Sequence, residues 1–138
     1  MTDVSKTIAF IGVGKMGLPM SVLVAKAGYA VTAFDQSAAR SNEARGQGIA
    51  IAASPAEAVS GKAAVVTSLP DDMALRGALL GPAGIIAAMQ PGAVLVETST
   101  VSVEASSEVA AAAQARGISY LRSPVSGNAS IVHTGALT

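Results

Sequence analysis

The sequence contains no cysteine and no tryptophan, and only one of its 138 residues is a histidine, His133. Without cysteine, neither a disulfide framework nor a thiolate metal site can form. A zinc site built on His133 would need several carboxylates around that side chain, and the sequence shows no such pattern. We therefore expect no metal site.

Charge and long apolar runs are scarce as well. Charged residues make up 13% of the chain and the formal net charge is zero, so no basic stripe is available to bind nucleic acid. No apolar run is long enough to span a bilayer. The polar start, residues 1–6, lacks the basic flank and cleavage site of a signal peptide. These absences predict a soluble cytoplasmic protein without nucleic-acid or membrane partners.

The residues that are abundant indicate an α/β protein. Hydrophobic residues make up 51% of the chain, and with two Phe and two Tyr they are mostly Ala, Val, Ile and Leu. Runs of β-branched residues alternate with alanine-rich stretches, which is typical of buried parallel strands covered by helices. The length is that of one ordinary domain. Repeated strand–helix–strand units predict a doubly wound parallel sheet with helices on both faces, in three layers.

Six strands and six helical segments are expected, bounded by caps, prolines and glycines. The strands are expected at 7–13, 30–34, 49–51, 63–68, 94–97 and 118–121. The helices are expected at 16–27, 37–45, from 54, from 71 or 72 through 80, at 85–89 and at 103–116.

Three glycines at the end of the first strand form the strongest motif. Gly12, Gly14 and Gly17 stand in the order Gly-x-Gly-x-x-Gly, and Val13, Lys15 and Met16 fill the gaps. The first glycine permits a tight turn, the second lets a pyrophosphate approach the backbone, and the third lets the helix pack closely on the sheet. The free N–H groups of the helix N-terminus then face the phosphates. This is the dinucleotide-binding fingerprint of a Rossmann fold, in which Lys15 either contacts a phosphate or stays solvated.

An acidic residue follows the second strand at the place where this fold binds a ribose. Asp35 lies 18 residues after Gly17, close to the spacing expected for a carboxylate that accepts bonds from the adenosine ribose hydroxyls. Gln36 follows it, and the nearest arginine is Arg40. A carboxylate repels the 2′-phosphate of NADP, so NAD is the expected cofactor. The alternatives are a turn or helix-capping role for Asp35 and a glycine turn without a ligand.

With these motifs in place, the sequence resembles the β-hydroxyacid dehydrogenases, a family that includes 3-hydroxyisobutyrate dehydrogenase, tartronate semialdehyde reductase and, more distantly, 6-phosphogluconate dehydrogenase. The likeness runs through nearly the whole chain. It is carried by the segments 10–20, 26–31, 54–57, 68–70, 91–92, 97–100 and 123–128.

The resemblance implies roles for individual residues. Leu69 and Pro70 would line the cofactor cleft, and Thr100 would contact the nicotinamide region. The loop residues Ser126, Gly127 and Asn128 would hold the carboxylate of a small substrate. Plainer interpretations remain open, because Leu69-Pro70 also suits a strand exit, Thr100 a helix cap and Ser126-Gly127 a simple turn.

Two positions depart from the family pattern. The loop before the substrate residues begins with Arg122 where the family usually has an acid, which predicts an altered substrate choice. Asn128 replaces a glycine; asparagine tolerates positive φ, so the loop conformation can survive.

The resemblance also implies what lies outside the chain. In the family a lysine on a later helix is the general acid/base, and a helical second domain closes the site and builds the dimer. We expect residues 1–138 to form the dinucleotide-binding domain alone, ending before that lysine. Lys15, Lys26 and Lys62 do not match its motif.

The function expected for the intact enzyme is hydride transfer between NAD and a small 3-hydroxy acid or its semialdehyde, in a homo-oligomer, with the 138-residue chain itself inactive. The alternatives are a non-catalytic dinucleotide-binding module and an imine-reducing relative.

Overall fold

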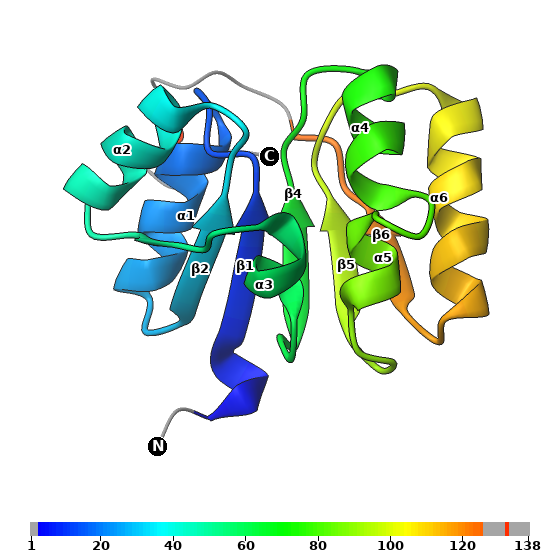
Figure 1. The fold of residues 1–138 in the computed structure, drawn as a ribbon, viewed down its shortest axis with the longest axis horizontal. Helices are drawn as coiled ribbons and strands as arrows, with labels where there is room; N and C mark the ends of the chain where they lie inside the picture. Colours follow the sequence, from blue (N-terminus) through cyan, green and yellow to red (C-terminus); the bar gives the residue numbers. More distant parts are fainter. Residues whose placement is uncertain (1–2, 126–131, 133–138) are drawn as a thin grey trace.

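The computed structural model describes residues 3–125 and 132, and it contains a six-stranded, fully parallel sheet (Figure 1). The strand order is β3-β2-β1-β4-β5-β6. The strands are β1 (Thr7–Ile11), β2 (Ala30–Phe34), β3 (Ala50–Ile51), β4 (Ala64–Thr67), β5 (Val94–Glu97) and β6 (Ser119–Arg122). The chain builds outward from β1 in one direction and then from β4 in the other, which confirms the predicted Rossmann-type sheet.

Six α-helices connect the strands, and a short 3-10 turn, η1 (Val4–Lys6), precedes β1. The helices are α1 (Gly17–Lys26), α2 (Ala38–Gly46), α3 (Pro55–Val59), α4 (Asp72–Leu79), α5 (Ile85–Ala88) and α6 (Val103–Ala115). Four of them begin at a side chain that accepts a hydrogen bond from a backbone N–H of the first turn; these caps are Ser37, Ser54, Asp71 and Ser102. Such caps satisfy N–H groups that have no partner inside the helix.

The element boundaries lie within two residues of those expected in most cases. The first helix begins at Gly17 rather than Met16, and the last strand is shifted by one residue to end at Arg122. The first strand ends at Ile11, so Gly12 and Val13 belong to the turn that follows it. The 3-10 turn at Val4–Lys6 was not predicted, because its cap, Asp3, lies in a segment without hydrophobic periodicity.

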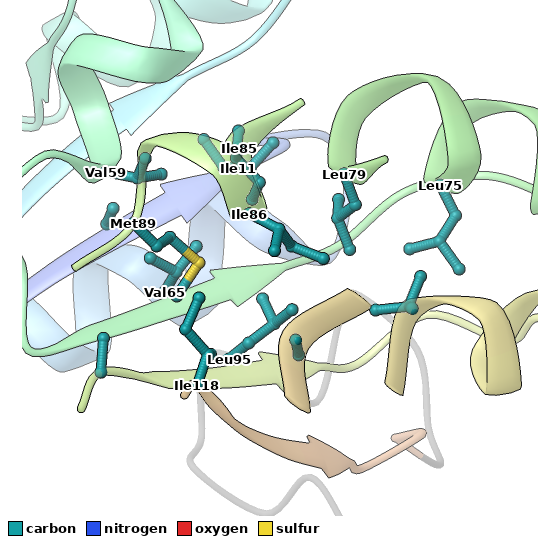
Figure 2. Packing of buried hydrophobic residues seen from close by; sticks show 14 of the residues in the cluster. Ile11, Val59, Val65, Leu75, Leu79, Ile85, Ile86, Met89, Leu95 and Ile118 are labelled. Atoms are coloured by element: carbon teal, nitrogen blue, oxygen red, sulfur yellow. The ribbon is translucent and has the colours of Figure 1, made fainter. Parts of the chain in front are cut away.

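The sheet is covered on both faces, and the side chains of β1 divide between two cores. Phe10 packs with Leu18 of α1 and Ala44 of α2 on one face. Ile11 belongs to the larger core on the opposite face, which is formed with α3, α4, α5 and α6. Figure 2 shows this core, in which Leu75 and Leu79 of α4 and Ile85 and Ile86 of α5 lie in one cluster with Val65 and Leu95 of the sheet. The alternation along the central strand therefore fixes which helices lie on each face.

None of the helices in the described part of the chain is both long and apolar enough to cross a membrane.

Candidate functional site

A cleft of about 480 Å³ opens at the carboxyl ends of the central strands. It lies where β1 and β4 are neighbours, the point at which the direction of strand addition reverses. In open parallel sheets, this reversal point is where ligands bind, because the loops on its two sides diverge and leave a crevice. One wall carries Gly12, Asp35, Gln36, Ser37 and Arg40; the other carries Ser68, Leu69, Pro70 and the α4 residues Ala74, Gly77 and Ala78.

The turn between β1 and α1 is compact because two of its glycines touch backbone. Gly12 has φ +97°, and a Cβ built on it would lie 2.1 Å from the carbonyl oxygen of Ser68. A Cβ on Gly17 would lie 2.1 Å from the carbonyl oxygen of Gly12. Any side chain at either position would force the turn away from the exit of β4 or the helix away from the turn. These two glycines thus bring the start of α1 up to the cleft.

The helix start itself is open to a ligand. Met16 is the N-cap of α1, and no side chain caps its first N–H groups within the described residues. Gly14 is partly exposed and Lys15 is exposed, so this turn is open to solvent next to Gly12 and Arg40, which line the cleft. Free N–H groups at a helix N-terminus, reinforced by the helix dipole, are a ready-made anion site.

Arg40 lies closer to this turn than its position in the sequence indicated. A Cβ placed on Gly14 would be 3.3 Å from the Cζ and Nη1 atoms of Arg40. The guanidinium of the third residue in α2 therefore stands beside the bare backbone of Gly14 and adds a permanent positive charge at the helix start. The prediction that weighed Arg40 only as a possible partner of a 2′-phosphate missed this contact, because the fold of α2 against the glycine turn is not visible in the local sequence.

Asp35 joins the exit of β2 to the glycine turn. Its Oδ2 accepts a hydrogen bond from the N–H of Val13 at 3.0 Å, and its Oδ1 accepts one from the N–H of Ser37 at 2.8 Å. Asp35 therefore does stabilise the turn, which is one of the two roles expected for it. A carboxylate offers about four lone-pair sites, so each oxygen keeps capacity for a further donor such as a ribose hydroxyl. Gln36, next to it, is exposed at the rim of the cleft.

The exits of β4 and β5 are linked directly. The N–H of Leu69 donates to Ser99 Oγ at 2.6 Å, which fixes the turn that carries Leu69 and Pro70. Thr100 is exposed, whereas Thr98, Ser99 and Val101 around it are buried. The cap of α6 is Ser102, so Thr100 does not cap that helix. Leu69 and Pro70 line the cleft, while Thr100 is not among its lining residues.

Sequence reasoning missed Glu97, which is fully buried at the end of β5. Its carboxyl group accepts hydrogen bonds from the hydroxyl of Thr67 and from the N–H of Ser99. The signal was available, because Leu95 and Glu97 have the same parity on a strand that is otherwise apolar. An acidic residue in a core-facing position of a strand is unusual, because burying a carboxylate is costly.

Two charged side chains of α4, Asp72 and Arg76, have pKa values shifted by hydrogen bonds. Hydrogen bonding from Ser102 lowers the pKa of Asp72. The hydrogen bond to Glu108, at 2.7 Å, raises the pKa of Arg76. Both contacts join α4 to α6 or to the loop before it.

Three of the expected site residues, Ser126, Gly127 and Asn128, lie outside the described residues, as does His133. Arg122 is described, and its Nη2 donates to the carbonyl oxygen of Val101 at 2.7 Å. Among residues 3–125 and 132, no group of three or more His, Asp or Glu side chains is placed to hold a metal ion.

This arrangement, with a parallel sheet, a glycine turn, an open helix start and an acid after β2, defines a dinucleotide-binding Rossmann domain. Residues 7–138 match the family described as the NAD binding domain of 6-phosphogluconate dehydrogenase, and the chain belongs to that family. The expected NAD-binding domain of the hydroxyacid dehydrogenase family is thereby confirmed.

Individual relatives are similar over almost the whole chain. The NAD-dependent L-serine dehydrogenase of Pseudomonas aeruginosa is 36% identical, with 96% of this chain and 45% of that protein covered. The 2-(hydroxymethyl)glutarate dehydrogenase of Eubacterium barkeri is 34% identical over 95% of this chain and 44% of its own length. The structure of Mycobacterium tuberculosis 3-hydroxyisobutyrate dehydrogenase with L-serine superposes with a TM-score of 0.90 at 35% identity, covering 96% of this chain and 44% of that one. The chain thus spans less than half the length of these relatives.

Proposed function

We propose that this chain is the NAD-binding part of a dehydrogenase that transfers a hydride between the cofactor and a small 3-hydroxy acid or its semialdehyde. The observation that carries the proposal is the start of α1, which no described side chain caps and which follows the cleft-lining Gly12, with Asp35 hydrogen-bonded to the same turn. Backbone donors for a diphosphate and a carboxylate for a ribose stand together at the reversal point of the sheet.

The residues present fit a dinucleotide. The N–H groups of Gly14, Lys15 and Met16 would hold the diphosphate, and Arg40 would add charge beside it. Asp35 would accept from the adenosine ribose, with Gln36 at the rim. Pro55 and Ala78 give the cleft an apolar lining suited to a flat base. Leu69, Pro70 and Thr100 would meet the nicotinamide half, and the bound nicotinamide would supply the hydride acceptor.

The preference for NAD over NADP rests on the balance between Asp35 and Arg40. The Asp35 carboxylate would stand where a 2′-phosphate has to fit and would repel it. Arg40 would attract such a phosphate, but its guanidinium already lies against Gly14, on the diphosphate side. We expect NAD to bind more tightly, with Arg40 reducing the margin.

The names of the relatives suggest a substrate class. L-serine, 3-hydroxyisobutyrate and 2-(hydroxymethyl)glutarate, taken from the names of the three relatives, all carry a primary alcohol on the carbon next to the one that bears a carboxylate. A site for this class needs donors for the carboxylate and a base for the alcohol proton. The hydroxyl of Ser126 and the backbone of Gly127 and Asn128 would supply the donors.

The described lysines are poorly placed to act as that base. Lys6, Lys15 and Lys26 are exposed, and Lys62 donates to the carbonyl oxygen of Ser60 at 3.4 Å. None of the four lines the cleft. We propose that the general acid/base is a lysine beyond Thr138 and that the 138-residue chain binds cofactor without turning over.

The test compares this chain with the full-length gene product, each assayed for NAD reduction at 340 nm. The full-length protein should oxidise L-serine, 3-hydroxyisobutyrate or 2-(hydroxymethyl)glutarate, and should discriminate against 3-hydroxybutyrate, whose alcohol is secondary. Light scattering on the same sample should show a homo-oligomer.

Two outcomes would contradict the proposal. Steady NADH production by the 138-residue chain would show that the acid/base lies within it. A full-length protein that binds NAD but oxidises none of these acids would favour the non-catalytic module.

A further inference from the structure

Glu97 lies at a core-facing position of β5, where apolar side chains are expected. It ends β5, its register partner on β4 is Thr67, and it is fully buried on the face of the sheet that carries the larger core. Within residues 3–125, the ion pair that forms is Arg76 with Glu108, on the surface, so Glu97 has no described cation as partner. Burying such a group is costly unless hydrogen bonds compensate for the lost water.

Hydrogen bonds do compensate, and they all lead to the strand exits at the cleft. One carboxyl oxygen of Glu97 accepts from the hydroxyl of Thr67, at the end of β4. The other accepts from the N–H of Ser99, two residues further along. Beside this contact, the N–H and the hydroxyl of Thr98 both donate to the carbonyl oxygen of Thr67, at 3.0 and 2.7 Å. The ends of β4 and β5 are therefore bound together by side chains as well as by the strand ladder.

The network continues to the residues that face the cleft. Ser99, held through its N–H by Glu97, uses its hydroxyl to accept from the N–H of Leu69 at 2.6 Å. The path from Glu97 through Ser99 thus ends on the turn that carries Leu69 and Pro70. Loss of the Glu97 carboxyl would free the N–H of Ser99 and with it the anchor of Leu69.

The far end of the loop after β5 is fixed by different groups. The carbonyl oxygen of Val101 accepts from Arg122 at 2.7 Å, and the N–H of Ser102 donates to Asp72 at 2.8 Å. Thr100, which lies between these contacts and Ser99, is exposed. A single exposed threonine is thereby presented by a loop that is anchored on both sides.

We propose that Glu97 is a positioning residue, whose buried carboxyl group locks the exits of β4 and β5 so that Leu69 and Thr100 meet the nicotinamide half of the cofactor in a fixed arrangement. This inference rests on the proposed function. An acid retained at a core position against the apolar pattern of its strand is a local inconsistency of the kind found at functional sites. Glu97 acts through Ser99 and Thr67 and does not itself reach the cleft lining.

Two substitutions separate the hydrogen-bonding role from the packing role. Glu97→Met keeps an unbranched side chain of similar length but removes both acceptors. Glu97→Gln keeps an acceptor for the N–H of Ser99, and its amide can donate to the hydroxyl of Thr67, so it should restore the lock. Ser106→Ala is the matched control, because it removes a buried hydroxyl that bonds to Tyr120 at 2.9 Å, on α6 and away from the loops.

The experiment titrates the wild-type chain and these variants with NADH and, separately, with ADP-ribose, which lacks the nicotinamide. We expect Glu97→Met to raise the Kd for NADH about tenfold while changing that for ADP-ribose less than about twofold, since a lost buried hydrogen bond typically costs about one order of magnitude. The fluorescence anisotropy of saturating NADH should fall, because the ring is held less firmly. Glu97→Gln should stay within about threefold of wild type on the same scale, and Ser106→Ala should match wild type.

Equal weakening of NADH and ADP-ribose, or unchanged NADH binding by folded Glu97→Met, would overturn the inference while leaving the proposed function intact. A folded wild-type chain that binds neither ligand would overturn both. Should Glu97→Met not fold, Ser99→Ala carries the same test, because it removes the acceptor for Leu69 and should weaken NADH selectively.

Discussion

The two walls of the cleft differ in where their polar groups lie. On the β1–β2 side, no side chain of the described residues caps the start of α1, and the polar side chains of Gln36 and Arg40 are exposed. On the β4–β5 side, Glu97, Thr98 and Ser99 are buried; Glu97 accepts from the N–H of Ser99, and Thr98 donates to the carbonyl oxygen of Thr67. The first wall offers backbone N–H groups to an anionic ligand, and the second is a hydrogen-bonded network that fixes the conformation of its loops. Substitutions in the first wall should therefore weaken ligand binding directly, whereas those in the second should act through loop conformation.

The largest effect is expected where the two walls touch. Gly12→Ala places a Cβ 2.1 Å from the carbonyl oxygen of Ser68 at a φ of +97°, so it should lower the free energy of unfolding by on the order of 3 kcal/mol. Gly61→Ala is the control: it has φ +70° but open space around the added carbon, and it should cost only about 1 kcal/mol. Urea unfolding followed by far-UV circular dichroism measures both. Equal costs would show that the close approach of the walls does not matter.

The next effect concerns the charge on the first wall. Asp35→Asn removes a charge-assisted acceptor and should raise the Kd for NADH about tenfold, with a smaller change for NADPH. Asp3→Asn is a matched control, since Asp3 also accepts from an N–H two residues ahead but lies before β1 and away from the cleft. Calorimetric titration with both cofactors gives the result. A parallel loss of NADH and NADPH would assign Asp35 to the turn alone.

A smaller effect is expected for the cation on the same wall. Arg40→Gln removes the guanidinium beside Gly14 and should weaken NADH about fivefold at low salt, with a shallower dependence on ionic strength. Arg45→Gln, on the same helix but bonded to Asn42, should leave NADH binding unchanged. Titrations at two salt concentrations make the comparison. Identical curves for the two variants would remove Arg40 from the site.

The smallest effect is expected behind the second wall. Hydrogen bonding from Ser102 lowers the pKa of Asp72 below its ordinary value of 3.8 on folding, so the carboxylate stabilises the fold above that pH. This contribution is lost as the pH falls through the lower, folded value. The difference in urea midpoint between wild type and Asp72→Asn should be constant between pH 6 and pH 8 and shrink below about pH 4. A difference that grows on acidification would contradict this sign.

The sequence predicted the first wall far better than the second, for a physical reason. Gly12, Gly17 and Asp35 act through local backbone conformation and short spacing, so their pattern can be read along the chain. Glu97 acts through Thr67, which lies 30 residues earlier, and their contact exists only once β4 and β5 are paired. Arg40 is the intermediate case: its helix was expected, but its approach to Gly14 depends on how α2 packs.

Leu69 and Pro70 could likewise be predicted only in part from the sequence. A cleft-lining position follows from the strand exit and is found in the structure, whereas the hydrogen bond that fixes Leu69 comes from the distant Ser99. Arg122 is a different case. The sequence predicted a role in substrate choice, and the contact found in the structure is a hydrogen bond from its guanidinium to the carbonyl oxygen of Val101.

The most direct test of the account is a titration of the ¹⁵N-labelled chain with NADH, followed by amide NMR. We predict saturable shifts for the amides of Gly14, Lys15, Met16 and Ser37, with residues 106–115 of α6 unaffected. A folded chain in which those four amides do not move, or in which the shifts are confined to α6, would contradict the claim that the open start of α1 binds the dinucleotide.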